Sequence, residues 1–370
     1  MNINVNQLIL KLVDTARKGI KQYFNDDTGL FDYLLTDEAV QKEKKSLLYT
    51  HSLISLLGIR HQRDKCGMNY KKAVETIYQI FMTSPGGIRE HSLLLWLLAK
   101  NSDDRAVKAY ESLIKLPEQE IVKAETMELA WMLTALVFEY NRINDSSIKL
   151  KLSDVAKLLK NRFIEKSNLF LHRDPHYSKL DIRYNIGNFA DQIYSIYAFS
   201  TMTKLTDEKK HLKTAEACAN KLVSLQGEKG QWWWHYNASD GSVIQKFPVF
   251  SVHQDSMTPF SFMALNEVSE NNYNPYISLG LRWLTNENEL NANMINENKN
   301  YVRRGIQRKT PFSEIQKFTT VASKLSTIFS LSEKFDQPKY LQIMNWEHSY
   351  HLGWILYAYT EENKPLWSQL

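Results

Sequence analysis

Glycine and proline are scarce in this sequence, at 13 and 9 of 370 residues. An all-β fold needs many tight turns, so this scarcity speaks against one. The two cysteines, Cys66 and Cys218, lie far apart and form no ligand pattern, which disfavours a disulfide scaffold and a zinc site. The longest apolar runs, such as residues 93–98, are far shorter than a membrane span.

Several catalytic motifs are also missing: a Gly-rich phosphate loop, HExxH, GxSxG and Cys/His metal spacing. The pairs Glu125/Glu128 and His348/His351 have an i,i+3 spacing that metal ligands use, but such pairs are common by chance. We therefore expect no metal and no cofactor. The net charge of +5 is mild and spread along the chain, so it permits an acidic substrate but does not indicate nucleic acid.

The N-terminal residues 1–20 have apolar positions spaced by charges, which indicates an amphipathic helix rather than a signal peptide. We expect a soluble, cytoplasmic protein, and the sequence leaves its oligomeric state open. No linker or composition shift divides the chain, so we expect one domain over residues 1–370. Apolar residues recur every three or four positions, as in amphipathic helices. The expected helices are 5–24, 46–60, 69–82, 88–100, 104–116, 122–141, 147–165, 189–204, 208–226, 254–268, 273–285, 312–333 and 347–360.

The expected helices alternate in character. One set has a polar side, whereas the other is apolar nearly all round and must be enclosed by other helices. The enclosed set comprises residues 52–59, 92–99, 129–137, 193–200 and 352–359. Alternation of this kind predicts helical hairpins closed into a ring or extended as a solenoid; an irregular helical bundle is the alternative.

A short internal repeat supports the hairpins. Residues 24–31 match residues 163–170 in spacing and ending, and residues 225–232 form a weaker third copy. In each copy a polar turn with Gly or Asn ends one helix, and an aromatic residue then fills the gap before the next.

Polar residues gather where the enclosed helices begin, in six segments: 49–52, 89–92, 125–128, 188–192, 251–256 and 347–351. These segments hold five of the ten histidines and six carboxylates, namely His51, His91, His253, His348, His351, Glu90, Glu125, Glu128, Asp191, Asp255 and Glu347. If the enclosed helices run parallel inside a ring, the segments converge on one rim and line a funnel that could hold a ligand. Helix capping is the alternative: it explains Thr50, Ser92, Asp191 and Glu125, but explains the histidines poorly.

Aromatic residues crowd residues 231–264, where Asp240-Gly241 predicts a hairpin turn. Aromatic rings beside polar groups suit the faces of sugars. We expect Trp233 to be buried. For Trp232 and Trp234, taken to share the other face of a strand, packing and ligand contact are equally favoured.

Two further segments could complete a site. On the loop 171–185, Arg173 and Arg183 could bind a carboxylate or phosphate, although loop arginines are commonly just solvated. Residues 301–305 could form a strand that delivers a basic residue to the rim.

The sequence also resembles known families. The residues Leu222-x-x-x-Gln226-x-x-x-Gly230-x-Trp232 resemble the second half of the QW repeat of squalene–hopene cyclase and prenyltransferase toroids, but their Asp-x-Asp-Asp and DDxxD motifs are missing. The six helix starts are similar to the (α/α)6 toroids of six-hairpin glycosidases, uronate lyases and epimerases. The segments NFADQIYSIYA, GQWWWHY, SVHQDSMTP and YHLGWILYAY resemble bacterial toroid proteins that carry no established activity.

These resemblances and the rim together predict an all-α (α/α)6 toroid with a small β-hairpin insertion. The leading hypothesis is an enzyme that acts on an acidic bacterial poly- or oligosaccharide as glycosidase, uronate lyase or epimerase. Asp255 and Asp191 would be the acid/base pair, with Glu90 as a third candidate and His253 as a proton shuttle. The expected saccharide-binding residues are Trp232, Trp234, Tyr236, His91, His348, His351, Gln192, Gln254, Arg183 and His51.

Two other functions stay open. A terpenoid or prenyl cyclase would use Asp255 as its protonating acid above an apolar, aromatic floor. A glycan-binding protein of a polysaccharide assembly system would hold a saccharide without turnover.

Overall fold

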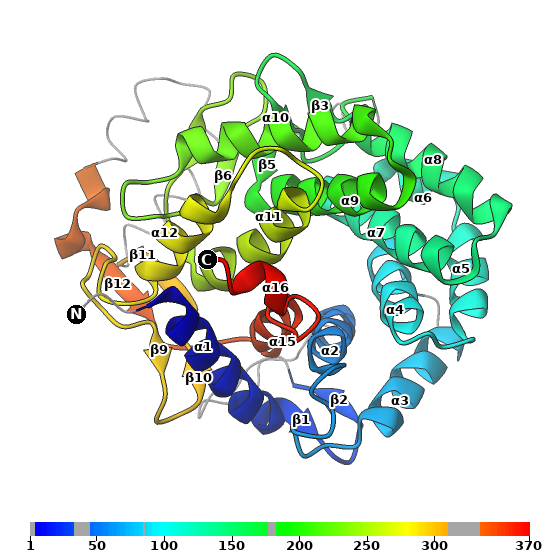
Figure 1. The fold of residues 1–370 in the computed structure, drawn as a ribbon, viewed down its shortest axis with the longest axis horizontal. Helices are drawn as coiled ribbons and strands as arrows, with labels where there is room; N and C mark the ends of the chain where they lie inside the picture. Colours follow the sequence, from blue (N-terminus) through cyan, green and yellow to red (C-terminus); the bar gives the residue numbers. More distant parts are fainter. Residues whose placement is uncertain (1–3, 33–44, 84–85, 177–182, 310–333) are drawn as a thin grey trace.

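Helices arranged around one axis make up most of the structure, a computed structural model that describes residues 4–32, 45–83, 86–176, 183–309 and 334–370 (Figure 1). The sequences that are apolar all round form the inner helices, since only there are all their sides covered. Each inner helix contacts the next, and the last contacts the first. In ring order they are α2 (Lys45–Ile59), α4 (Ile88–Lys100), α7 (Thr126–Ile143), α9 (Phe189–Thr206), α11 (Thr258–Asn266) with the preceding π-helical turn η2 (His253–Met257), and α15 (Ser349–Ala358).

The amphipathic sequences form an outer layer, one outer helix against each inner helix (Figure 1). The outer helices are α3 (Tyr70–Thr83), α5 (Ala106–Ile114), α8 (Ser146–Lys160), α10 (Lys209–Leu225), α12 (Asn274–Trp283) and α1 (Val5–Ile20). They pack on α2, α4, α7, α9, α11 and α15 respectively, so the first helix of the chain closes the ring against the last inner one. Six hairpins in a closed ring confirm the (α/α)6 toroid.

Short strands lie at the amino-terminal end of the inner helices. One strand comes just before each of α9, η2 and α15 in the chain and leads into it. One sheet has the order β5 (Ile186–Asn188), β6 (His235–Asn237), β7 (Val243–Gln245), and another β12 (Leu341–Met344), β11 (Gly305–Arg308), β8 (Val249–Phe250). The remaining strands pair as β1 (Phe24–Asn25) with β2 (Leu30–Phe31), β3 (Phe163–Ile164) with β4 (Leu169–Phe170), and β9 (Ile295–Asn296) with β10 (Tyr301–Val302). The β6–β7 hairpin turns at Asp240-Gly241, as predicted.

The internal repeat is structural. In the first two copies the outer aromatic residues pair across a hairpin, Phe24 with Phe31 and Phe163 with Phe170, with ring centroids 5.1 and 5.0 Å apart. The third copy forms no strand. The final aromatic residue of every copy, Phe31, Phe170 or Trp232, is nevertheless 0% exposed, as expected of a residue that fills a gap between helices.

Most expected helices are present within a few residues, with two differences. The segment 122–141 is divided, because Ala124 and Glu125 are extended and separate α6 (Glu118–Lys123) from α7. Helix α8 ends at Lys160, and the β3–β4 hairpin begins at Phe163. The expected helix 312–333 lies outside the described residues. No helix that the structure describes is both long enough and apolar enough to cross a membrane.

Candidate functional site

A cavity of about 190 Å³ lies at the amino-terminal end of the inner ring, and we call it the mouth pocket. Every inner helix contributes to its wall through Thr50, Arg89, Met127, Ala190, His253 and Tyr350. The polar helix starts therefore do converge on one concavity. This convergence follows from parallel inner helices, whose first turns meet at the same end of a ring.

The wall of the mouth pocket is mainly aromatic. Trp131, Tyr194 and Trp354 line it one turn further along their helices, beside Trp234. The His253 ring stacks between Phe189 and Trp234, with centroids 4.4 and 5.5 Å away. Burial lowers the pKa of His253 well below its ordinary value, so its imidazole is neutral at pH 7. The same cause lowers the pKa of His51, which also lines the pocket.

Arg304 supplies positive charge to this aromatic wall. Its guanidinium lies over the rings of Phe250, Tyr350 and Trp346, at 4.6, 5.2 and 5.8 Å from their centroids. Its backbone N–H donates to the Trp346 carbonyl at 2.9 Å, which fixes the residue between β10 and β11. Its Nε and Nη1 are buried and have no hydrogen-bond partner among the described residues. The segment 301–305 thus brings a basic residue to the rim, as predicted.

The second arginine of the pocket, Arg89, is already paired. It donates to Glu128 Oε1 at 2.9 and 3.1 Å and lies 3.8 Å from Glu125. Glu125 also accepts from Arg173 at 2.8 Å. Burial raises the pKa of Glu128, whereas a hydrogen bond from His172 lowers that of Glu125 to about 2.

His172 connects this ion-pair network to Asp191. The His172 Nδ1 lies 2.9 Å from Asp191 Oδ2. Burial lowers the pKa of His172, but the carboxylates of Asp191 and Glu125 outweigh it and raise the pKa to about 10. His172 is therefore an imidazolium at neutral pH, held between two carboxylates.

Three of the rim carboxylates close capping boxes, which confirms the capping explanation for Asp191 and extends it to Glu128 and Glu90. Asp191 accepts from the backbone N–H of Asn188 at 2.9 Å, and Glu128 accepts from that of Glu125 at 2.8 Å. Glu90 accepts from the Gly87 N–H at 3.1 Å. Its other oxygen accepts from the Thr50 hydroxyl at 3.4 Å, so Glu90 lies one hydrogen bond from the mouth pocket.

Asp255 belongs to a fully buried charged group and does not line the pocket. His351 Nε2 lies 2.7 Å from Asp255 Oδ2, and its Nδ1 forms an ion pair with Glu347. Glu347 also accepts from the Val302 N–H at 2.8 Å. His351, expected to bind saccharide, therefore ties η2, α15 and β10 together in the core.

The two glutamines expected to bind saccharide instead hold the repeat turns. Gln192 accepts from the Phe170 N–H at 2.7 Å. With the Gln254 amide oriented to satisfy both neighbours, its oxygen accepts from the Trp232 N–H at 3.2 Å. Ser52 does the same for Phe31, at 2.9 Å.

Of the expected aromatic platform, only Trp234 lines the pocket. Trp232 and Tyr236 are 0% exposed, and Trp232 packs on Phe189 and Phe262. Residues 231–234 precede strand β6, so the alternation of a strand does not apply to them. Trp233 is buried as expected, with its indole N–H donating to the Leu225 carbonyl at 2.7 Å.

The other expected residues lie around the pocket or away from it. His348 is the N-cap residue before α15, and its ring centroid lies 5.2 Å from that of His51. His91 faces Phe81 on α3, with centroids 6.0 Å apart. Arg183 is exposed on the loop before β5. Among the residues described, no three His, Cys, Asp or Glu side chains are grouped as metal ligands.

Fold and site together define a toroid of six helical hairpins with an aromatic and cationic pocket of about 190 Å³ at the amino ends of its inner helices. No protein-family model and no curated protein matches the sequence.

Solved structures do show the same fold. An unsaturated glucuronyl hydrolase specific for heparin superposes with a TM-score of 0.63 at 10% identity, over 95% of this chain and 96% of its own. The unsaturated glucuronyl hydrolase from Bacillus sp. GL1, responsible for the degradation of glycosaminoglycan, gives 0.61 at 12% identity, over 98% of both chains. The unsaturated glucuronyl hydrolase from Streptococcus agalactiae superposes with a TM-score of 0.59 at 12% identity, over 97% of this chain and 91% of its own. At these identities the likeness establishes the toroid fold.

Proposed function

We propose that this protein is a carbohydrate-active enzyme that binds an acidic saccharide in the mouth pocket, with the sugar carboxylate on Arg304. The observation that carries the proposal is the Arg304 guanidinium, whose Nε and Nη1 are buried, without partners among the described residues, and beside aromatic rings. A buried donor left without an acceptor costs about 1–3 kcal/mol, and a carboxylate would satisfy it with a charge-assisted bond.

The aromatic wall suits the rest of a sugar. The apolar face of a pyranose stacks on indole and phenol rings; Tyr350 lies beside the arginine, and Trp234 lines the same pocket. The toroids reported above are named as hydrolases of unsaturated glucuronyl groups, which carry a carboxylate. That agreement is an analogy between folds and supports the proposal only in that sense.

Glu90 is our candidate for proton transfer. Asp191 and Asp255, the pair inferred from sequence, have their oxygens engaged by backbone N–H groups or by histidines. We assign them as positioning residues, Asp191 for His172 and Asp255 for His351. Glu90 reaches the pocket through Thr50, and neutral His253 can hydrogen-bond a sugar hydroxyl there.

The test is turnover of two substrate sets. Loss of the uronyl double-bond absorbance measures turnover of unsaturated glucuronyl disaccharides, and mass spectrometry detects the products of these and of a panel of glucuronides. We expect Glu90→Gln to lower kcat about a hundredfold or more and to leave binding intact. The matched control is Glu120→Gln, because Glu120 also accepts from the start of α4, at 3.3 Å from the Ile88 nitrogen, whereas Glu90 accepts from Thr50 of the pocket wall. Turnover by Glu90→Gln at the wild-type rate would reject the assignment.

A second candidate is saccharide binding without turnover. It is favoured by one observation: all six rim carboxylates are engaged in caps or ion pairs. It predicts that the wild type binds the same saccharides and processes none of them. The cyclase alternative is weakened, because Asp255 is ion-paired with His351 and so is a poor protonating acid.

A further inference from the structure

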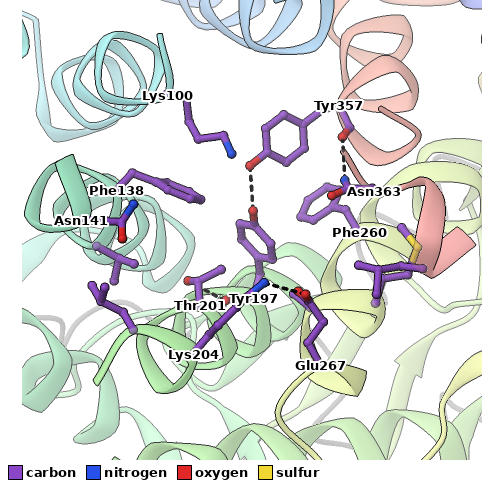
Figure 2. A pocket seen from close by; sticks show the side chains of 15 residues that line it. Lys100, Phe138, Asn141, Tyr197, Thr201, Lys204, Phe260, Glu267, Tyr357 and Asn363 are labelled. Atoms are coloured by element: carbon purple, nitrogen blue, oxygen red, sulfur yellow. Dashed lines mark hydrogen bonds and ion pairs between the residues drawn. The ribbon is translucent and has the colours of Figure 1, made fainter. Parts of the chain in front are cut away.

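Figure 2 shows a second cavity, of about 340 Å³. Its lining residues place it at the opposite end of the ring from the mouth pocket. It is formed where α4, α7, α9, α11 and α15 end, and we call it the back pocket. The residues that line it include Lys100, Phe138, Tyr197, Lys204, Phe260 and Tyr357. Aromatic rings separate it from the mouth pocket: Trp354 lines the mouth and contacts Phe260 and Tyr357 at 5.3 and 5.4 Å.

The back pocket combines apolar walls with one undercompensated positive charge. Figure 2 shows Phe138 and Phe260 on opposite sides of the cavity and the Lys100 amine pointing between Phe138 and Tyr357. This amine lies 4.7 Å from the centroid of the Phe138 ring. The other amine, that of Lys204, is already paired with Glu267 at 2.5 Å.

In the part of the chain that the structure describes, Glu362 is the one carboxylate within 4 Å of the Lys100 amine, at 3.8 Å. Glu362 is shared, because Arg60 and His61 approach it more closely, at 3.2 and 3.0 Å. Burial lowers the pKa of Lys100 to about 8, so the amine is still mostly charged at pH 7. The Lys100 ammonium therefore lacks a counter-ion of its own.

Helix-dipole compensation is the simpler explanation for a lysine in the last turn of a helix. Here Arg60 already fills that role, since its Nη1 donates to the Lys100 carbonyl at 2.7 Å. The cavity also offers a neutral donor: Tyr197 and Tyr357 share one hydrogen bond of 2.7 Å, and two hydroxyls hold two protons. One of these protons stays available to an acceptor in the pocket.

We propose that the back pocket binds a small carboxylate on a flat apolar body, with the Lys100 amine as counter-ion and Phe138 and Phe260 as walls. The tyrosine pair would donate to the second carboxylate oxygen. This proposal is independent of the mouth pocket, which takes its anion on Arg304.

Isothermal titration of the full chain with benzoate, and with benzamide as its uncharged counterpart, tests the proposal. We expect one benzoate per chain and about tenfold weaker binding of benzamide. Lys100→Met keeps the apolar stem and should weaken benzoate about tenfold or more, at an unchanged circular dichroism spectrum. Lys160→Met is the matched control, since Lys160 also lies over a phenylalanine ring and pairs with a glutamate, but at the surface.

Three outcomes would overturn it: no benzoate binding by the wild type, equal binding of benzoate and benzamide, or unchanged benzoate affinity in Lys100→Met. Arg304→Met distinguishes the two cavities. Benzoate binding that is lost in Arg304→Met and kept in Lys100→Met would place the anion in the mouth pocket and reject the back-pocket site.

Discussion

Replacing Asp255 by asparagine tests whether this carboxylate supports the fold rather than the chemistry. Asp255 and His351 are both 0% exposed, so water does not screen their ion pair. Removing one partner of a buried pair costs about 3–5 kcal/mol. Burial lowers the pKa of His351, but Asp255 and Glu347 outweigh it and raise the pKa from 6.5 to about 9, which is equivalent to about 3 kcal/mol. Because Glu347 still faces His351 in the variant, we expect a loss of about 3 kcal/mol.

The assay is urea denaturation at several pH values. A raised histidine pKa contributes stability that is complete below about pH 6.5 and is lost as the pH rises through about 9. The difference between wild type and Asp255→Asn should therefore shrink over this range. Asp240→Asn, in the exposed hairpin turn, is the control and should change stability by less than about 0.5 kcal/mol. Wild-type stability of Asp255→Asn together with lost turnover would refute the reasoning and return Asp255 to the catalytic group.

Three other changes follow from the packing, the ion-pair network and the pocket wall. Gly58→Ala should lower the free energy of unfolding in urea by about 1–3 kcal/mol or more, because the added Cβ would lie 1.9 Å from the Gly353 carbonyl oxygen where α2 crosses α15. An unchanged denaturation midpoint would contradict this close approach. For His172→Gln, the stability difference from wild type should be largest below about pH 6.5 and fade as the pH rises through about 10, because the pKa of His172 is raised. A stability difference that stays constant with pH would count against the ion pair. Trp234→Ala should raise the Kd of a bound saccharide by up to about tenfold in titration calorimetry, through lost stacking, and equal Kd values would remove Trp234 from the site.

The ring of helices could be predicted from the sequence, because a helix that is buried on all sides has apolar residues all round. Helices such as 92–99 and 193–200 have no polar face, so they had to be inner ones. The convergence of their starts then follows from parallel packing. The internal repeat could also be predicted, because a polar turn and a buried aromatic residue recur in it at a fixed spacing.

Which rim residues face the cavity could not be predicted. His253 lines the pocket, whereas Asp255, two residues on, pairs with His351. The π-helical turn η2 changes the angular spacing of side chains there. The partner of Asp255, His351, is nearly a hundred positions away in the sequence. The sequence predicted a basic residue from 301–305 at the rim, but whether Arg303 or Arg304 reaches it depends on the register of β11 between β8 and β12, which no local pattern specifies.

The affinity difference between methyl glucuronide and methyl glucoside, which differ only in a carboxylate, tests the role of Arg304 most directly. We expect the wild type to prefer the acid about tenfold or more, and Arg304→Met to lose that preference. Arg183→Met, an exposed loop arginine, should keep it. Equal affinity for both glycosides, or a preference that survives in Arg304→Met, would contradict an acidic-saccharide site at the mouth of the ring.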